Sequence, residues 1–180
     1  MKIRNAKGFT LIELLIVVAI IGIIAAIAIP SLLRARVSAN ESATLGDIRT
    51  LISSQAAYQS ANSGFYDSSL SCLTEPSNGS CIPSYPTIAP TFLDSQLASQ
   101  QSKSGYNRSF LGAAAPSAVP SSSSTTSMSV YSYDATPVNI GQTGVRGFAA
   151  DSSGRICFTN NGAAVGAANG VLPSNCQDLR

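Results

Sequence analysis

The sequence predicts an α+β fold in which one long N-terminal helix packs on a small antiparallel sheet. The first third of the 180 residues is apolar and then amphipathic, with helical spacing. The remainder is rich in Ser, Gly, Ala, Asn and Pro, which is typical of short strands joined by many loops. These features divide the chain into a basic N-terminal peptide (1–8), an apolar helical segment (9–30), an amphipathic helical segment (31–61) and a globular head (62–180).

The basic character of the chain lies in its first eight residues. Lys2, Arg4 and Lys7 precede Gly8, and without these three the remaining eight basic residues face nine acidic ones. Cationic flanks of membrane segments stay in the cytoplasm, so the head is expected on the opposite side of the membrane. The rest of the sequence has no basic patch that would suggest nucleic acid as a partner.

The apolar segment is long enough to cross a membrane, because residues 9–29 would span roughly 32 Å as a helix. Only Thr10 and Glu13 interrupt it with polar side chains. One interpretation is a secretory signal peptide, and Ala26–Ala28 has the small residues of a cleavage site, but the apolar run exceeds the usual length of about 7–15 residues. A second is a plain membrane anchor, which leaves Glu13 unexplained because a carboxylate is costly in a membrane helix.

The stretch GFTLIEL at residues 8–14 resembles the prepilin cleavage and methylation motif of type IV pilins and of the pseudopilins of type II secretion. A short basic leader ends in Gly8, Phe9 follows it, and Glu13 is the fifth residue after this boundary. Gly22 and Pro30 in the apolar run match the family as well. The resemblance covers residues 1–60 and implies a pilin-like fold.

The resemblance implies a role for each of these residues. Prepilin peptidase would cut between Gly8 and Phe9, and Phe9 would then be N-methylated. Glu13 would pair with the α-amine of Phe9 in a neighbouring subunit during assembly, because a carboxylate in hydrocarbon is less costly beside a cation. Gly22 and Pro30 would let the segment between them lose helicity in the filament, and the alternative is a simple kink at Pro30.

The amphipathic segment Ser31–Ala61 is expected to lay one face on the head. The apolar residues Leu45, Ile48, Ile52 and Ala56 recur at helical spacing, with Leu51 beside them, whereas Asn40, Glu41, Asp47, Arg49 and Ser53 fall mostly elsewhere. Together with the apolar segment it should form one helix of about 50 residues, roughly 75–80 Å long. The run Ser60–Gly64 is expected to end that helix.

The head is expected to contain about four short antiparallel strands. The expected strands are Tyr106–Leu111, Met128–Tyr133, Val145–Ala150 and Arg155–Thr159, and the last two flank a turn signal at residues 151–154. A short helix is predicted at Thr91–Gln101, with Phe92, Leu93 and Leu97 facing inward. The low-complexity segment Pro116–Ser127 is predicted to be an exposed loop.

Four cysteines, all beyond the apolar segment, predict two disulfides in an oxidising compartment. Turn-forming residues separate Cys72 from Cys81, which favours a local bond between them. Cys157 and Cys176 enclose a loop rich in Gly, Ala and Asn, and closing it is worth about 3 kcal/mol in the chain-entropy model. The two pairings that cross between these groups stay open at this point.

The sequence favours a structural protein over an enzyme. Without histidine the chain has no Ser-His-Asp triad, no Cys-His pair and no histidine ligand for zinc, and it has neither G-x-S-x-G nor a P-loop. No cofactor is expected. No metal is expected either, because Asp151 and Asp178 near the C-terminus are not part of a dense run of acids.

The resemblance implies a structural subunit of a type IV pilus. Such a subunit would be stored in the inner membrane with its head in the periplasm, and then polymerised through its helix into a surface filament for adhesion, motility or DNA uptake. The implied partners are further copies of the chain, the prepilin peptidase and N-methyltransferase, an inner-membrane assembly platform and the lipid bilayer. The alternative is a pseudopilin of a type II secretion system, which builds a short periplasmic filament by the same chemistry.

Overall fold

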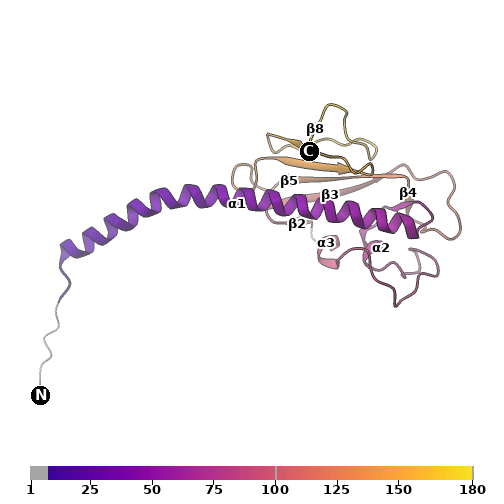
Figure 1. The fold of residues 1–180 in the computed structure, drawn as a ribbon, viewed down its shortest axis with the longest axis horizontal. Helices are drawn as coiled ribbons and strands as arrows, with labels where there is room; N and C mark the ends of the chain where they lie inside the picture. The colour runs from indigo at the N-terminus through magenta and orange to yellow at the C-terminus, as the bar shows by residue number, and fades with distance from the viewer. Residues whose placement is uncertain (1–7, 100, 180) are drawn as a thin grey trace, which may run out of the picture. The chain divides into compact units, whose positions relative to one another are not determined.

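The computed structural model describes residues 8–99 and 101–179 of the chain (Figure 1). The chain divides into two compact units, Met1–Arg36 and Val37–Arg180. Helix α1 (Leu11–Ala61) begins in the first unit and ends in the second. The expected leader lies outside the described residues except for Gly8. The α+β architecture predicted from the sequence is confirmed.

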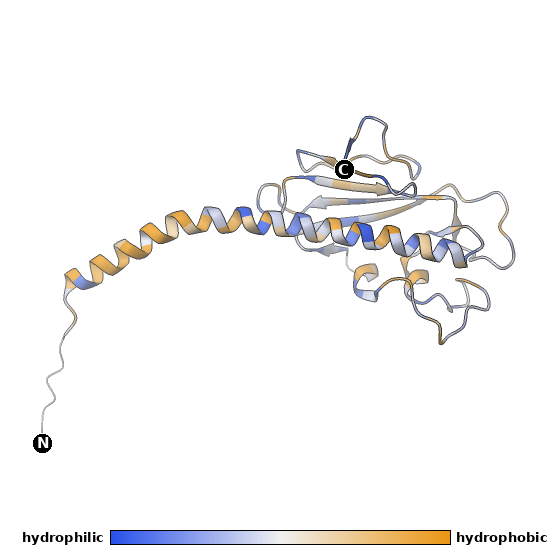
Figure 2. Ribbon diagram, in the orientation of Figure 1, coloured by the Kyte–Doolittle hydropathy of each residue, from blue (hydrophilic) through white to orange (hydrophobic). Residues whose placement is uncertain are grey.

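The N-terminal part of α1 is apolar on all sides. Every large hydrophobic side chain from Phe9 to Leu33 is exposed, and Figure 2 shows the hydrophobic colour running along this part of the helix. Among the described residues, α1 is the one helix that is long and apolar enough to cross a bilayer, judged by length and composition. A surface of this kind needs lipid or protein around it.

The second unit is built on an antiparallel sheet. Within the described part of the chain its strand order is β2-β3-β5-β6-β7-β8. The strands are β2 (Ser102–Lys103), β3 (Tyr106–Ala113), β5 (Val130–Pro137), β6 (Gly147–Asp151), β7 (Ile156–Thr159) and β8 (Gln177–Asp178). A smaller sheet pairs β1 (Tyr66–Asp67) with β4 (Ser127–Met128).

The four longer strands of the main sheet fall where the sequence predicted strands, but one expectation was wrong. Met128–Tyr133 was expected to be a single strand, whereas β4 ends at Met128 and β5 begins at Val130. The chain changes partner between them, because Met128 pairs with Tyr66 and Val130 pairs with Ala113. The two-residue strands β1, β2 and β8 are too short to show alternation in the sequence.

The predicted helix at Thr91–Gln101 is shorter than expected. Helix α3 covers only Ser95–Ser99, because the N–H groups of Phe92 and Leu93 donate to the carbonyl of Leu73 and keep that stretch out of the helix. Asp94 then accepts the N–H of Gln96 at 2.7 Å, as an N-cap does. Helix α2 (Leu70–Thr74) was not predicted.

The hydrophobic core lies between α1 and one face of the main sheet, which we call the inner face (Figure 1). From α1 it contains Ile48, Leu51 and Tyr58, and from the inner face it contains Tyr106, Tyr133, Ala135 and Phe148. The opposite face of the sheet is the outer face. Alternation along each strand places the neighbours of these core residues on the outer face.

The face of α1 that packs on the head is the predicted one except for Ala56, which is exposed. Ile48 and Leu51 are buried, and Leu45 and Ile52 are half-buried and pack against the core. The buried residues also include a set that the apolar pattern does not mark, namely Glu41, Thr44, Ser54, Gln55 and Tyr58. The apolar pattern could not show this, because several of these side chains are buried through hydrogen bonds to distant parts of the head.

Glu41 joins α1 to the loop before β6. Its Oε1 accepts the N–H groups of Val145 and Arg146 at 3.0 and 3.1 Å, and its Oε2 accepts the Arg146 side chain at 2.7–2.8 Å. Burial raises the pKa of Glu41, but these hydrogen bonds outweigh the burial and hold the pKa below its ordinary value. We call this set of contacts the Glu41 clamp.

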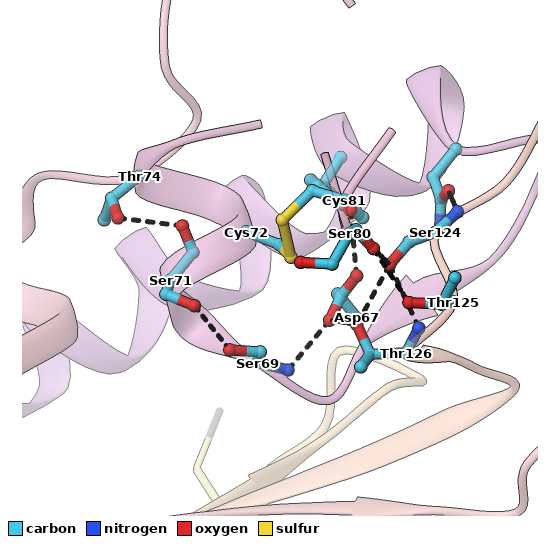
Figure 3. Close-up of a disulfide and its surroundings, with 12 residues drawn as sticks. Asp67, Ser69, Ser71, Cys72, Thr74, Ser80, Cys81, Ser124, Thr125 and Thr126 are labelled. Atoms are coloured by element: carbon cyan, nitrogen blue, oxygen red, sulfur yellow. Dashed lines mark hydrogen bonds between the residues drawn. A yellow bond between two sulfur atoms is a disulfide. The ribbon is translucent and has the colours of Figure 1, made fainter. Parts of the chain in front are cut away.

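A second polar cluster, around Asp67, joins the C-terminal end of α1 to the smaller sheet, and Figure 3 shows its contacts with Ser69 and Thr126. Asp67 is fully buried, and its carboxylate accepts the hydroxyls of Tyr58 and Thr126 at 2.8 and 2.7 Å. The same carboxylate accepts the N–H of Ser69 at 2.8 Å. The carboxylate is therefore satisfied within the fold, which is the condition for burying it at modest cost.

The loop Pro116–Ser127 is only partly exposed, contrary to expectation. Ser123, Ser124 and Ser127 are buried. Ser124 and Ser127 are held by the side chain of Asn62, which directly follows α1. Its Oδ1 accepts the backbone N–H of Ser124 at 2.7 Å, and its Nδ2 donates to the hydroxyl of Ser127 at 2.9 Å. A serine-rich sequence can thus be ordered when an amide side chain supplies its hydrogen bonds.

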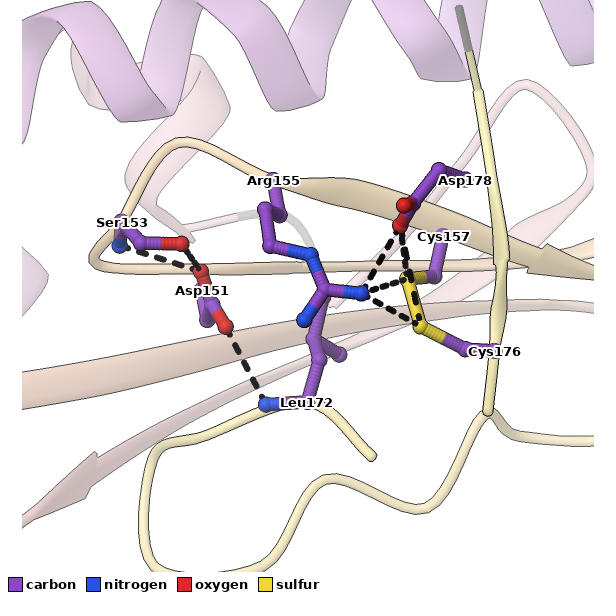
Figure 4. Close-up of polar contacts among 7 residues, drawn as sticks. All are labelled: Asp151, Ser153, Arg155, Cys157, Leu172, Cys176 and Asp178. Atoms are coloured by element: carbon purple, nitrogen blue, oxygen red, sulfur yellow. Dashed lines mark hydrogen bonds and ion pairs between the residues drawn. A yellow bond between two sulfur atoms is a disulfide. The ribbon is translucent and has the colours of Figure 1, made fainter. Parts of the chain in front are cut away.

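The outer face of the main sheet is partly covered by the C-terminal loop, residues 160–176. Ala149, Cys157 and Leu172 form a small buried cluster there, with Val165, Ala167 and Cys176 packed against it. Asp151 fixes this loop, because its Oδ2 accepts the N–H of Leu172 at 3.1 Å (Figure 4). Its Oδ1 accepts the backbone N–H of Ser153. The part of the outer face over β3 and β5 carries polar side chains and a pocket.

Candidate functional site

The residues that the sequence singles out for processing and assembly lie at the start of α1. Thr10 directly precedes the helix, and its Oγ1 accepts the N–H of Glu13 at 3.3 Å. The Oε2 of Glu13 in return accepts the N–H of Thr10 at 2.9 Å and its hydroxyl at 2.5 Å. This reciprocal arrangement is a capping box, which satisfies backbone donors that a helix start otherwise leaves unpaired.

The capping box also satisfies part of the Glu13 carboxylate within a single chain. Both donors from Thr10 reach Oε2, and Oε1 accepts no hydrogen bond from the described residues. An acid in the first turn is further favoured by the positive end of the helix dipole. Glu13 can therefore sit in an unassembled chain and still offer one oxygen to a further donor.

The bond that a prepilin peptidase would cut is not part of the capping box. The N–H of Thr10 belongs to the Phe9–Thr10 peptide, whereas the expected cut is at the Gly8–Phe9 peptide before it. Cleavage there would leave both hydrogen bonds intact and create an α-amine on Phe9. Sequence reasoning missed the role of Thr10, although the pattern Thr10-x-x-Glu13 is the signature of a capping box.

Gly22 and Pro30 both lie within α1, which continues as a helix through them. A Cβ atom built on Gly22 would meet nothing within 4 Å, so no contact in the single chain requires glycine there. Arg34 donates to the carbonyl of Pro30 at 3.4 Å. The loss of helicity expected between Gly22 and Pro30 concerns the assembled filament and stays a prediction.

The head carries two disulfides. The first and second cysteines of the chain form one, and the third and fourth form the other. The Cys72–Cys81 bond connects α2 to the loop that follows it, with 5.4 Å between the Cα atoms (Figure 3). The Cys157–Cys176 bond closes the C-terminal loop, with 5.7 Å between the Cα atoms (Figure 4). The crossed pairings left open by the sequence are not those of the structure.

One group of side chains in the head has the composition of a metal site. The sulfurs of Cys157 and Cys176 and a carboxylate oxygen of Asp178 lie within 4.8 Å of one another. Both sulfurs belong to the disulfide and are not thiolate ligands. Asp178 pairs instead with Arg155 at 2.9 Å (Figure 4), so the group holds the C-terminal loop together.

Comparison with known proteins points to the same end of the chain. The model of the prokaryotic N-terminal methylation motif matches residues 3–29, a range that includes Gly8, Phe9, Glu13 and Gly22. Helix, capping box and motif together define a prepilin-type N-terminus. In this segment the chain is similar to type IV pilins.

Two characterised relatives match over the N-terminal third. The type IV wide pilus major component PilA4 of Thermus thermophilus is 52% identical over 62 residues, which are 34% of this chain and 47% of the relative. The type IV major pilin protein PilA of Myxococcus xanthus is 44% identical over 64 residues, which are 36% of this chain and 29% of the relative. The matched segment thus spans less than half of either relative. No solved structure matches the chain significantly.

Proposed function

We propose that the chain is a structural subunit of a type IV pilus. The observation that carries this proposal is the Glu13 carboxylate, held in a capping box at the start of an apolar, exposed helix within the methylation-motif segment. A membrane anchor or a signal peptide needs no carboxylate at this position. A subunit that must recognise the processed end of its neighbour does need one.

Before assembly, the helix is stored in the inner membrane with its head in the periplasm. Thr10 lowers the cost of keeping Glu13 near the membrane, because its N–H and hydroxyl replace part of the water that the carboxylate would lose. The exposed apolar side chains of α1 are covered by lipid in this state. The two disulfides suit the oxidising periplasm.

Assembly begins when prepilin peptidase cuts after Gly8. The new α-amine of Phe9, which is then N-methylated, is largely cationic near neutral pH because its reference pKa is about 7.7–8.0. It pairs with Glu13 of a neighbouring subunit as an assembly platform moves the helix from lipid into the filament core. A subunit in the wrong axial register leaves both charges unpaired in an apolar environment, so the pair selects the register. An uncut leader would place the amine too far away.

Electron microscopy of filaments sheared from the cell surface tests this function. Antibodies raised against the head should label these filaments along their length in the native host, and a strain that lacks the gene should lose them. A chain found only in short periplasmic assemblies would instead support the pseudopilin alternative. Surface filaments that remain unlabelled and unchanged in the deletion strain would contradict the proposal.

A further inference from the structure

We infer that the outer face of the sheet carries a binding site for a saccharide. A pocket of about 610 Å³ opens over β3 and β5, with Ala164 of the C-terminal loop at one side. Its uncharged polar side chains and its one carboxylate are those of Gln101, Ser102, Asn107, Ser109, Asp134 and Thr136. The volume falls within the range of roughly 300–1,000 Å³ that is usual for small-molecule sites. The site does not depend on filament assembly.

The strand register brings these polar residues together in two adjacent rows. Asn107 pairs with Ser102 on one side and with Thr136 on the other, and Ser109 pairs with Asp134. Their neighbours along β3 and β5, such as Tyr106 and Tyr133, lie in the core beneath α1, so the polar set points away from the core. Directly paired side chains have Cβ atoms about 4.5–5.5 Å apart, which lets several of them reach one ligand together.

Asp134 is the carboxylate that lines this pocket. Its Oδ1 atom is enclosed and has no hydrogen-bond partner, and the side chain lines the pocket. Burial raises the pKa of Asp134. That atom is closed to solvent and therefore to a ligand as well, but Asp134 as a whole is only half-buried. A ligand that donates hydroxyl groups to the accessible part of this carboxylate would offset part of the cost of burying it.

The donor and acceptor pattern favours a polyhydroxy ligand over the other classes. Hydroxyl and amide side chains both donate and accept, as sugar hydroxyls require, whereas Asp134 accepts and would repel an anion. Arg108 also borders the pocket, but its Nη2 pairs with Asp47 of α1. Its Nε and Nη1 are enclosed without a partner, so the guanidinium is not open to an anion in the pocket. One carboxylate is too few for calcium, which takes 6–8 oxygen ligands and usually several carboxylates. The described lining contains no aromatic and no large aliphatic side chain, so an apolar ligand would gain little burial.

Saturation-transfer NMR on the full-length chain, held in micelles of a sugar-free zwitterionic detergent, tests the site. The probes are glucose, galactose, mannose and N-acetylglucosamine. At least one should bind with a Kd on the order of 1 mM. Asp134→Asn should weaken binding about tenfold or more, and Ser109→Tyr, which fills the pocket from an exposed position, should abolish it.

The matched control is Asp94→Asn, which makes the same change at an exposed position outside the pocket. It should leave binding unchanged, and circular dichroism should show that all three variants are folded. The inference is wrong if none of the four sugars binds, if binding survives both pocket variants, or if calcium alone binds. Because the chain is unassembled in the micelle, these results do not depend on whether it forms pili.

Discussion

Replacing Glu13 with glutamine is expected to stop filament growth while the chain still enters the membrane. Glutamine can keep the capping box, because its side-chain oxygen still accepts the two donors of Thr10. It cannot supply the negative charge that the Phe9 amine needs. Electron microscopy of the cell surface should show at least about tenfold fewer filaments, and membrane fractionation should recover the chain at its normal level.

Two variants separate the charge of Glu13 from its role in capping the helix. Thr10→Ala removes the hydroxyl of the capping box and keeps the carboxylate, so it should impair assembly less than Glu13→Gln. Glu75→Gln makes the same chemical change at an exposed position in the head and should leave filaments normal. Normal filaments in Glu13→Gln would refute the pairing role. Loss of the chain from the membrane would show that Glu13 acts in insertion instead.

Replacing Glu41 with glutamine is expected to destabilise the head by about 2–3 kcal/mol, because it removes the charged partner of Arg146 from a largely buried site. Glutamine still accepts one or two of the hydrogen bonds but leaves the guanidinium without its counter-charge. Chemical denaturation of the full chain in detergent, followed by circular dichroism, measures the change. Glu75→Gln is again the control and should shift the free energy of unfolding by no more than about 0.5 kcal/mol.

The Glu41 clamp also predicts a pH dependence. The pKa of Glu41 is lower in the folded chain than its ordinary value of 4.5. The unfolded chain therefore binds the proton more readily, and the stabilisation by Glu41 is fully present above this value and is lost as the pH falls through the folded pKa. The stability curves of the wild type and of Glu41→Gln should converge as the pH falls below 4.5. Curves that stay parallel through this range would show that the charge of Glu41 contributes nothing.

The parts of the fold that the sequence predicted are those whose signals are local. The long helix, its end at Ala61 and the hairpin around residues 151–154 follow from apolar spacing, helix-breaking residues and turn chemistry. The N-terminal motif is local as well, so the amino-acid sequence alone is enough to propose Gly8, Phe9 and Glu13. Thr10 could have been included, because its capping partner is three residues away.

The features that escaped prediction depend on residues far apart in the sequence. Glu41 was expected on the polar face of α1. The sequence pattern does not reveal its partners, Val145 and Arg146, because they are more than a hundred residues away. Asp67 and Asn62 likewise become interpretable only when the serine-rich loop packs against them. The outer-face pocket around Asp134 arises from the pairing of β3 with β5, which no spacing within either strand reveals.

The most direct measurement is mass spectrometry of the N-terminus of this chain, recovered from sheared surface filaments of the native host. We expect the chain to begin at Phe9 and to carry an N-methyl group, with Glu13 and the whole apolar helix retained. A chain that begins at Met1 would show that filaments form without processing. A chain that begins at Ile29 would show that the apolar segment is a signal peptide, and either result would contradict a pilin processed after Gly8.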